Sequence, residues 1–502
     1  MDPATECPTS FCLLYEIAAG ASWSDGEVVT SADFAHTYQL FDDAPDGSGY
    51  EHVTGIDIID DKRFRVVFSE PIGSWQQLFR RVISERAAGP DASRAPTTGA
   101  FQIVDWTVGE ELLMRRNPDW WAETDPLSGE SIGAVDRLSF VFIDDLDDMV
   151  DALIDGDVDV ISARPDADAI AELAGAELVR YRVSPGPFWE HIDFHHQDVL
   201  LRERWLREAI SLGIDREEIL DATVRLIDPT ASGLDNTVWM SGTPWYEDHY
   251  VDRFHPEAAE RLLVDNGCVR GDDDVFSCRG RRLSFTWAST SDDPARRDTY
   301  ELVSEDLAAI GIELVEEFKS PSEFVGRDFL FGGPSAWQLI NFSWRAPLDP
   351  MSAAATYLCD DSDLNVNRYC SETVESAIRS AETTVDPVER AALLNKADAA
   401  YLDDHAVIPL YQKPRLLAWR SGIFGLEPNY SHSSDLWNIV SWKGPTSIVV
   451  ALPEEPDALD PLSFDDDNAN MIMSVLLYGA FGMSSSLDVV PALVESVTVV
   501  EG

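Results

Sequence analysis

The sequence predicts an α/β protein in which mixed sheets are flanked by helices and more than one domain is present. Strand-like and helix-like segments alternate between residues 137 and 183, which is typical of βαβ units. A second alternation of this kind runs from residue 256 to residue 318. The chain has 502 residues, of which 45% are apolar. It is therefore long enough for about two to four domains, each with a core of its own.

Strands are expected where short runs of β-branched or aromatic residues end at turn residues. In chain order these runs are 11–17, 53–59, 63–68, 137–143, 158–161, 178–183, 188–194, 282–288, 312–318, 407–412, 448–452 and 497–500. The segment 341–344 is apolar and is expected to be central. A lone strand cannot satisfy its backbone groups, and no partner follows 497–500 along the chain. We therefore expect 497–500 to pair antiparallel with residues near Leu13–Ile17, as the two arms of a hairpin.

Helices are expected where apolar residues recur with helical spacing. In chain order these segments are 31–40, 73–81, 145–155, 166–173, 201–219, 256–266, 294–310, 374–383, 387–405 and 471–477. The segment 201–219 contains a corner at Asp215, followed by Arg216 and Glu217. Aspartate is a preferred capping residue, so we expect Asp215 to start a second helix there.

The charge of the chain excludes two classes of partner. It contains 37 Lys and Arg against 91 Asp and Glu, which gives a formal net charge of −54. Nucleic acids and anionic membranes both require a basic surface, so neither is an expected partner. The acidic residues are scattered through all segments, which indicates a solvated acidic surface. No apolar run approaches the roughly 18 residues that a membrane-spanning helix needs.

The six cysteines fall into three close pairs: Cys7 with Cys12, Cys268 with Cys278, and Cys359 with Cys370. Each pair encloses a short loop rich in turn residues, which suits a disulfide across a hairpin. Disulfides of this kind indicate an oxidising compartment. Metal binding and inert thiols are the alternatives, but the chain has no Cys-x-x-Cys motif of the kind that binds zinc.

Neither a metal site nor a catalytic site is expected from the sequence. Glu190, His191, His195 and His196 form the one histidine cluster. Residues 191 and 195 point to the same side of a strand but lie about 13 Å apart, too far to share one ion. Acidic turns such as Asp272–Asp274 lack the glycine and distal glutamate of a calcium loop. Nucleophile-elbow, zinc-protease, P-loop and dinucleotide motifs are absent, so we expect no enzyme activity and no cofactor.

Several motifs together resemble one family. Trp23-Ser-Asp-Gly26 is followed by a helix, residues 97–106 carry a Gly-Ala-Phe strand, and Arg116-Asn-Pro-Asp-Trp-Trp121 forms a turn. Residues 207–219 read Arg-Glu-Ala-Ile, then Ile-Asp-Arg-Glu-Glu-Ile. In these motifs the chain resembles the extracellular solute-binding proteins of the oligopeptide, dipeptide and nickel class of ABC importers. The resemblance implies a two-lobed periplasmic-binding-protein-like fold with an extra lobe.

The order of the landmarks differs from the family's order. The segments that resemble the first family landmarks, a strand, Leu-Asp-Pro, a helix-like run, Tyr-Gly and Pro-Ala-Leu-Val-Glu-Ser, stand at residues 448–496. The next landmark stands at Trp23–Gly26. We therefore interpret the chain as circularly permuted and opened in a hairpin loop. This implies a lobe I of residues 445–480, 122–196 and 421–444, an extra lobe II of 481–502 and 1–121, and a lobe III of 197–420.

The resemblance also implies the ligand-contacting residues. In peptide-binding relatives a tryptophan at the position of Trp344 lines the ligand pocket, and an aspartate three residues later takes the ligand's amino group. This chain has Pro347 at that position, which has no carboxylate. Trp344 and Asp349, the latter within Asp-Pro, are therefore the candidate ligand-binding residues of this motif. Arg345 is a candidate for facing an anionic group or for a surface ion pair. Further candidates by family position, for each of which core packing is the alternative, are Tyr478, Trp189, Trp239 and Trp437.

The expected function follows from the resemblance. A peptide-like or other small polar ligand is enclosed in a cleft between lobes and delivered to the permease subunits of an ABC importer. The protein is expected to be a monomer outside the cytoplasm, either periplasmic or anchored to the cell surface by a lipid. Two alternatives remain open at this point. One is a secreted hydrolase with two carboxyl groups about 5–10 Å apart, and the other is a binding protein coupled to a receptor.

Overall fold

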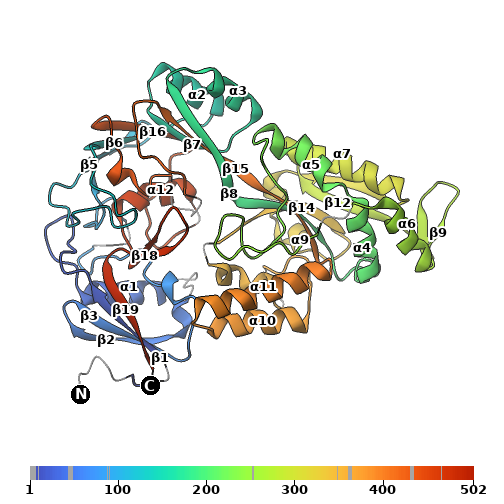
Figure 1. Ribbon diagram of the computed structural model, residues 1–502, viewed down its shortest axis with the longest axis horizontal. Coiled ribbons are helices and arrows are strands. Elements are labelled where there is room, and N and C mark those ends of the chain that lie inside the picture. Colours follow the sequence, from blue (N-terminus) through green and yellow to red (C-terminus); the bar gives the residue numbers. More distant parts are fainter. Residues whose placement is uncertain are drawn as a thin grey trace. The chain divides into compact units, whose positions relative to one another are not determined.

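The structure is a computed structural model, in which the chain forms two compact units (Figure 1). Unit 1 comprises Met1–Ser184, Thr383–Val385 and Arg415–Gly502, and unit 2 comprises Pro185–Glu382 and Asp386–Pro414. The division into lobes I, II and III stays a prediction. The residues that the structure describes are 7–9, 11–42, 49–87, 89, 91–251, 254–347, 349–359, 364–429, 435–464 and 466–501.

Unit 1 alternates strands with short helices, as its sequence pattern predicts. Its elements in chain order are β1 (Phe11–Ile17), α1 (Ser31–Asp42), η2 (Tyr50–His52), β2 (Val53–Asp60), β3 (Arg63–Phe68), η3 (Trp75–Gln77), β4 (Phe101–Thr107), β5 (Glu111–Arg116), β6 (Arg137–Phe142), α2 (Leu146–Asp155), β7 (Val160–Ala163), α3 (Ala167–Gly175), η6 (Ile439–Ser441), β16 (Ser447–Leu452), α12 (Asp467–Leu476), β17 (Phe481–Met483), β18 (Val489–Pro491) and β19 (Val494–Glu501). Two long strands, β8 (Val179–Phe194) and β15 (Val407–Arg420), run from one unit into the other.

The last strand of the chain pairs with the first one. Unit 1 contains a four-stranded sheet in the order β19-β1-β3-β2. Figure 1 shows the red β19 beside the blue β1, and in the register Leu13 faces Val499 while Tyr15 faces Val497. The antiparallel pairing expected for 497–500 is therefore confirmed. The circular permutation of the family's order stays a prediction, because Met1 and Gly502 lie outside the described residues.

A second sheet of unit 1 contains the strand at 447–452. Its strands follow the order β15-β7-β16-β6-β5-β4, and β16 runs parallel to both of its neighbours. Val450 lies opposite Phe140 on one side and Val160 on the other, and all three side chains are buried. A parallel strand that is covered on both faces needs a continuous apolar run, which residues 448–452 supply.

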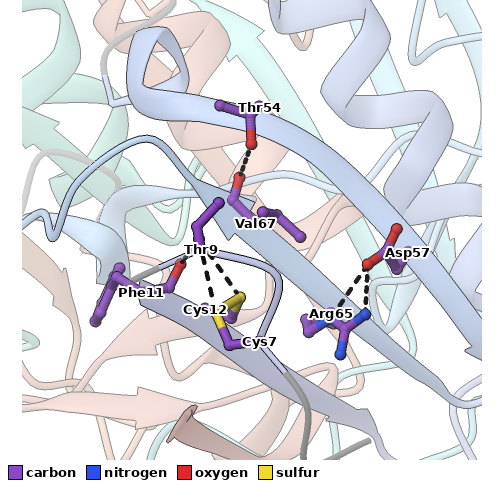
Figure 2. The surroundings of a disulfide bond; sticks show 8 residues. All are labelled: Cys7, Thr9, Phe11, Cys12, Thr54, Asp57, Arg65 and Val67. Carbon is purple, nitrogen blue, oxygen red and sulfur yellow. Dashed lines mark hydrogen bonds and ion pairs between the residues drawn. A yellow bond between two sulfur atoms is a disulfide. The ribbon is translucent and has the colours of Figure 1, made fainter. Parts of the chain in front are cut away.

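All three cysteine pairs are bonded, as predicted: Cys7–Cys12, Cys268–Cys278 and Cys359–Cys370. Figure 2 shows the first pair at the start of β1, where the Thr9 hydroxyl donates to the carbonyl of Phe11. This disulfide closes a loop at the edge of the chain's first strand. Each of the three cross-links joins residues that are 5, 10 or 11 positions apart, so each one constrains a local loop.

Unit 2 is a second α/β assembly. Besides its parts of β8 and β15, its elements in chain order are α4 (Arg204–Gly213), α5 (Arg216–Ala222), η4 (Val224–Leu226), α6 (Pro256–Asp265), β9 (Val269–Arg270), β10 (Phe276–Cys278), β11 (Arg281–Arg282), β12 (Ser284–Thr290), α7 (Pro294–Ala309), β13 (Glu313–Lys319), α8 (Pro321–Phe324), α9 (Arg327–Leu330), β14 (Leu339–Arg345), η5 (Pro350–Tyr357), α10 (Glu372–Thr383) and α11 (Pro387–Asp403).

The sheet of unit 2 has the strand order β13-β12-β14-β8, with β12 parallel to both neighbours and β14 antiparallel to β8. Helices α10 and α11 lie side by side (Figure 1) and bury apolar faces in the main core of this unit. The predicted cap at Asp215 is present, because its carboxylate accepts the backbone N–H groups of Glu217 and Glu218. This cap satisfies two of the free donors at the start of α5.

One expected helix and two expected strands differ from the prediction. The helix expected at 73–81 is reduced to the single turn η3, because Phe79 adopts a left-handed φ of 56° and donates its N–H to the Tyr50 hydroxyl. A helix cannot continue through such a residue. The strands expected at 178–183 and 188–194 form one strand, β8. Two carbonyl groups between them are hydrogen-bonded: Gly186 accepts from Gln412, and Pro187 accepts from the Ala346 N–H.

Replacing both Cys268 and Cys278 by Ser should lower the free energy of unfolding by about 2–3 kcal/mol, because the open loop regains chain entropy in the unfolded state. Urea-induced unfolding followed by circular dichroism measures this change. Reductant added to the wild-type protein opens the other two disulfides as well and should lower the free energy of unfolding at least as far. An unchanged urea midpoint, together with alkylatable thiols in the oxidised wild type, would show that the pair does not form.

Candidate binding site

Two tryptophans meet across neighbouring strands of unit 2. In the antiparallel register of β8 and β14, Trp189 lies directly opposite Trp344, and His191 lies opposite Phe342. Side chains two residues apart share one face of a strand, so these four rings form one layer. The His191 ring is 4.6 Å from Trp189 and 4.5 Å from Phe342, measured between ring centroids. Trp189 is only 5% exposed, whereas Trp344 is half-buried.

Trp189 and Trp344 of this layer form one wall of a cavity of about 270 Å³ that lies within unit 2. A second wall comes from η5 and a third from the segment just before Trp239. Apolar and aromatic groups dominate the lining, which is typical of sites for small organic ligands. The lining residues are Trp189, Thr237, Val238, Trp344, Arg345, Ala346, Pro347, Pro350, Ser352, Ala353, Thr356, Tyr357 and Leu364.

Asp349 holds the η5 wall in place. Its carboxylate accepts the Met351 N–H at 2.8 Å, which caps the start of η5, and it forms an ion pair with Arg390 of α11 at 2.5 Å. Asp349 is 7% exposed and is not one of the lining residues. The predicted ligand residue therefore lies at the base of the wall, with its carboxylate already bound by protein donors.

A buried polar network supports the wall at Thr237. One carboxylate oxygen of Asp398 accepts the Thr237 N–H at 2.8 Å and its hydroxyl at 2.6 Å. The other oxygen lies 2.7 Å from His249 Nδ1, and Nε2 of the same ring lies 3.4 Å from Glu247. The Tyr357 hydroxyl donates to the Thr237 carbonyl at 3.0 Å. Asp398 therefore links a titratable histidine to the lining residue Thr237, which in turn accepts from Tyr357.

The hydrogen bond with Asp398 raises the pKa of His249 above its usual value; partial burial opposes this rise, and the negative charges of Asp398 and Glu247 reinforce it. The protonated ring then carries a charge that complements the fully buried Asp398 carboxylate. The pairing of the two groups is therefore sensitive to pH.

The opposite face of β8 carries a buried charge cluster. Glu190 is 1% exposed and binds Arg296 of α7 and Lys413 of β15, each at 2.9 Å. Lys413 also contacts Asp293 at 2.5 Å, and Asp293 caps α7 through the Ala295 N–H. Burial opposes ionisation of Glu190, but the two cations outweigh it and lower its pKa. The cluster therefore stays charged and connects β8, α7 and β15.

The predicted histidine cluster forms no metal site in the part of the chain that the structure describes. His191 Nε2 lies 3.2 Å from Asp193, while His195 and His196 lie within hydrogen-bonding distance of the carbonyls of Gly332 and Ala406. Burial lowers the pKa of His196 to about 3, so this ring is neutral at physiological pH.

The other predicted residues are distributed over both units. Trp344, Arg345 and Trp189 line the cavity, and Trp239 packs in the main core of unit 2 directly after two lining residues. Tyr478 and Trp437 belong to unit 1 and are buried there. Their contribution to ligand binding stays a prediction.

Sequence reasoning missed the walls at Thr237 and η5. Thr237 lies in a segment without regular secondary structure, 161 residues from its partner Asp398. For η5 a signal was available, because Asp349-Pro350 has the cap and first-position residues of a helical turn. The lining residues Ser352, Ala353 and Thr356 of η5 are small and gave no indication of a binding site.

Comparison with known proteins agrees with this architecture. The family model described as bacterial extracellular solute-binding proteins, family 5 Middle, matches residues 14–362. The chain is 26% identical over 429 residues to the oligopeptide-binding protein OppA of Mycobacterium tuberculosis, covering 81% of this chain and 70% of that protein. It is 21% identical over 462 residues to the periplasmic oligopeptide-binding protein OppA of Salmonella typhimurium, covering 82% and 79%.

A solved structure shares the fold. The periplasmic EDTA-binding protein EppA superimposes with a TM-score of 0.73 and 21% identity, covering 86% of this chain and 84% of that chain. At this level of identity the likeness concerns the fold. It bears out the predicted two-lobed α/β class. Among the described residues no helix is long and apolar enough to cross a membrane.

Replacing Glu190 by Gln should lower the free energy of unfolding by about 3–5 kcal/mol, because Arg296 and Lys413 would each lose a buried carboxylate partner, which leaves Lys413 with Asp293 alone. Chemical denaturation measures the loss. The matched control is Glu316→Gln, which removes the exposed ion pair with Arg297 and should cost less than about 1 kcal/mol. Equal losses in the two variants would contradict a structural role for the buried cluster.

The ion pair of His249 should make stability depend on pH. The folded-state pKa of His249 is raised above 6.5, so its pairing with Asp398 stabilises fully below about pH 6.5 and is lost as the pH rises through the folded-state pKa. The difference in unfolding free energy between wild type and His249→Gln should therefore shrink from pH 6 to pH 9. His255→Gln, at an exposed histidine beside Glu257, is the control. A difference that stays constant over this range would rule out the linkage.

Proposed function

This chain belongs to the bacterial extracellular solute-binding proteins of family 5, and from that premise we propose that it captures a peptide or peptide-like molecule for an ABC importer. The match of the family model over residues 14–362 is the observation that carries the proposal. The importer's permease subunits are the proposed protein partners, and the protein is proposed to act as a monomer.

The cavity of unit 2 supports the choice of ligand. Both OppA relatives are named for binding oligopeptides. Side chains of peptides are compact and often apolar, and the indole rings of Trp189 and Trp344 offer flat apolar surfaces to such groups. The volume of about 270 Å³ is at the lower end for ligand sites. It suits one side chain of a peptide better than a whole peptide.

Members of this family bind solutes and do not transform them, and we propose the same for this chain. A hydrolase of the carboxylate type needs two carboxyl groups beside the substrate. Among the described residues that line the cavity, none is Asp or Glu. Family members are extracytoplasmic, which agrees with three disulfides. A periplasmic location or a lipid anchor on the cell surface is the finer proposal.

The experiment is a binding screen with a synthetic pool of pentapeptides that lack lysine. Thermal unfolding and native mass spectrometry record whether the pool stabilises the protein and which members stay bound. A ligand at 100 times its Kd should stabilise the folded state by about 2.7 kcal/mol. Absence of both stabilisation and bound peptide would contradict the peptide class.

Replacing Trp344 by Ala should weaken the binding of a captured peptide by about 1–3 kcal/mol, because one wall of the cavity loses its ring. Isothermal titration calorimetry measures the affinity, and chemical denaturation measures the stability of the same variant. Trp205→Ala, at a partly buried tryptophan of α4 that does not line the cavity, is the control and should leave the affinity unchanged. A large loss of stability with unchanged affinity would identify Trp344 as a core residue.

A further inference from the structure

His249 is not one of the residues that line the cavity of unit 2, but its ring lies between two carboxylates. Nδ1 is 2.7 Å from the Asp398 carboxylate of α11, and Nε2 is 3.4 Å from the Glu247 carboxylate. Only the protonated ring has a donor for each of these acceptors. A neutral ring keeps one N–H and turns the lone pair of its other nitrogen toward a carboxylate. The geometry therefore favours the charged form of His249.

The two carboxylates differ in their access to water. The Glu247 side chain is 64% exposed, so water can solvate it when the ring is neutral. Asp398 is fully buried. Besides His249, it binds the N–H and the hydroxyl of Thr237, and these groups carry no charge. Because a buried carboxylate without a cation is costly, the proton of His249 matters most to Asp398.

Thr237 connects this ion pair to the cavity. One oxygen of Asp398 accepts the Thr237 N–H at 2.8 Å and its hydroxyl at 2.6 Å, while the Tyr357 hydroxyl donates to the Thr237 carbonyl at 3.0 Å. Thr237 and Tyr357 both line the cavity. When His249 is neutral, the Asp398 carboxylate gains by turning toward water. Any such turn breaks the two bonds that fix Thr237, so the protonation of His249 is coupled to the shape of this wall.

The other described groups that contact His249 are an amide and a backbone carbonyl. Nδ2 of Asn236 lies 3.4 Å from Nδ1 of the ring. The backbone N–H of His249 donates to the Asp235 carbonyl at 2.8 Å, and the Asp235 carboxylate pairs with Arg216 of α5 at 3.0 Å. The groups that titrate against the ring itself are therefore Asp398 and Glu247.

We propose that His249 and Asp398 are positioning residues for the ligand: their ion pair holds the wall at Thr237 in the shape that the peptide binds, and loss of the proton weakens binding. This inference rests on the proposed peptide-binding function. It adds that capture is strongest in a mildly acidic medium and weakens as the medium becomes alkaline. By linkage, a bound peptide stabilises the protonated ring by the same factor.

The direction of the pH dependence follows from the pKa of His249. The hydrogen bond with Asp398 raises this pKa above 6.5; partial burial opposes the rise, and the charges of Asp398 and Glu247 reinforce it. The ring is therefore protonated below about pH 6.5, where affinity is highest. Affinity declines as the pH rises through the folded-state pKa. Because the peptide favours the protonated ring, binding raises this pKa further.

The test measures the affinity of one peptide at several pH values. The probe is the tightest-binding histidine-free member of the lysine-free pentapeptide pool. Isothermal titration calorimetry gives its Kd from pH 6 to pH 9 for the wild type, His249→Gln and Asp398→Asn. The amino terminus of the peptide also titrates in this range, but it does so against all proteins alike and cancels in their comparison. His255→Gln, at the exposed histidine beside Glu257, is the control and should follow the wild type.

We expect the Kd of the wild type to rise between pH 6 and pH 9 by about five-fold or more beyond the rise in His249→Gln. Asp398→Asn keeps the shape of the side chain and an acceptor for Thr237 but has no buried charge, so its affinity should follow that of His249→Gln. Equal changes in the wild type and His249→Gln would overturn the inference and leave the peptide function intact. If no member of the pool binds, the proposed function itself fails and the inference fails with it.

A second measurement needs no stable variant. NMR of histidine-labelled wild-type protein gives the pKa of His249 with and without saturating peptide. We expect the peptide to raise this pKa by an amount that matches the change in affinity with pH. A pKa of His249 that is the same in the free and the peptide-bound protein would show that the ion pair supports the fold alone, and the inference would be wrong.

Discussion

Glu190 imposes the constraint on which the candidate site in unit 2 depends. A carboxylate that is 1% exposed can stay ionised only if cations accompany it, and here Arg296 and Lys413 do so. Because these two residues stand on α7 and β15, the strand β8 is bound to a helix and to a second strand on the face opposite the cavity. Trp189, the next residue along β8, then points into the cavity. The position of this cavity wall is therefore fixed by the ion pairs of Glu190, which lie on the opposite face of β8 and do not line the cavity.

The other walls of the cavity are supported in the same way. Asp349 places the start of η5 through its bonds to Arg390 and to the backbone, and Asp398 places Thr237 while it binds His249. In both cases the protein's own donors bind a buried carboxylate. The cavity wall that this carboxylate holds in place is apolar or uncharged. The acidity of the chain, with 91 Asp and Glu against 37 Lys and Arg, is thus compatible with a cavity that has no acid among its described lining residues. A solute-binding protein gains specificity from such rigid walls, because a pre-organised cavity loses little entropy when a ligand enters.

Much of the fold was predictable because local physics controls it. The β-branched run 448–452 fits only a buried strand, Asp215 caps a helix, and close cysteine pairs bridge short loops, as the structure confirms. The pairing of 497–500 with β1 was predictable because a lone strand needs a partner. The helix expected at 73–81 failed because Phe79 bonds to Tyr50, a residue 29 positions away that no local pattern reveals.

The sequence by itself determined the family, the α/β class and the presence of Trp344 and Trp189 as candidate wall residues. Only the tertiary structure decided that these two residues are neighbours on one face of the sheet, since this depends on the register between β14 and β8. It also decided that Asp349 is neutralised by Arg390, 41 positions away, and that Glu190 is neutralised by cations 106 and 223 positions away. The physical reason is that the chemistry of a carboxylate depends on which charges folding brings near it. Long-range packing determines which charges lie nearby, so they cannot be predicted from the residues that are adjacent in the sequence.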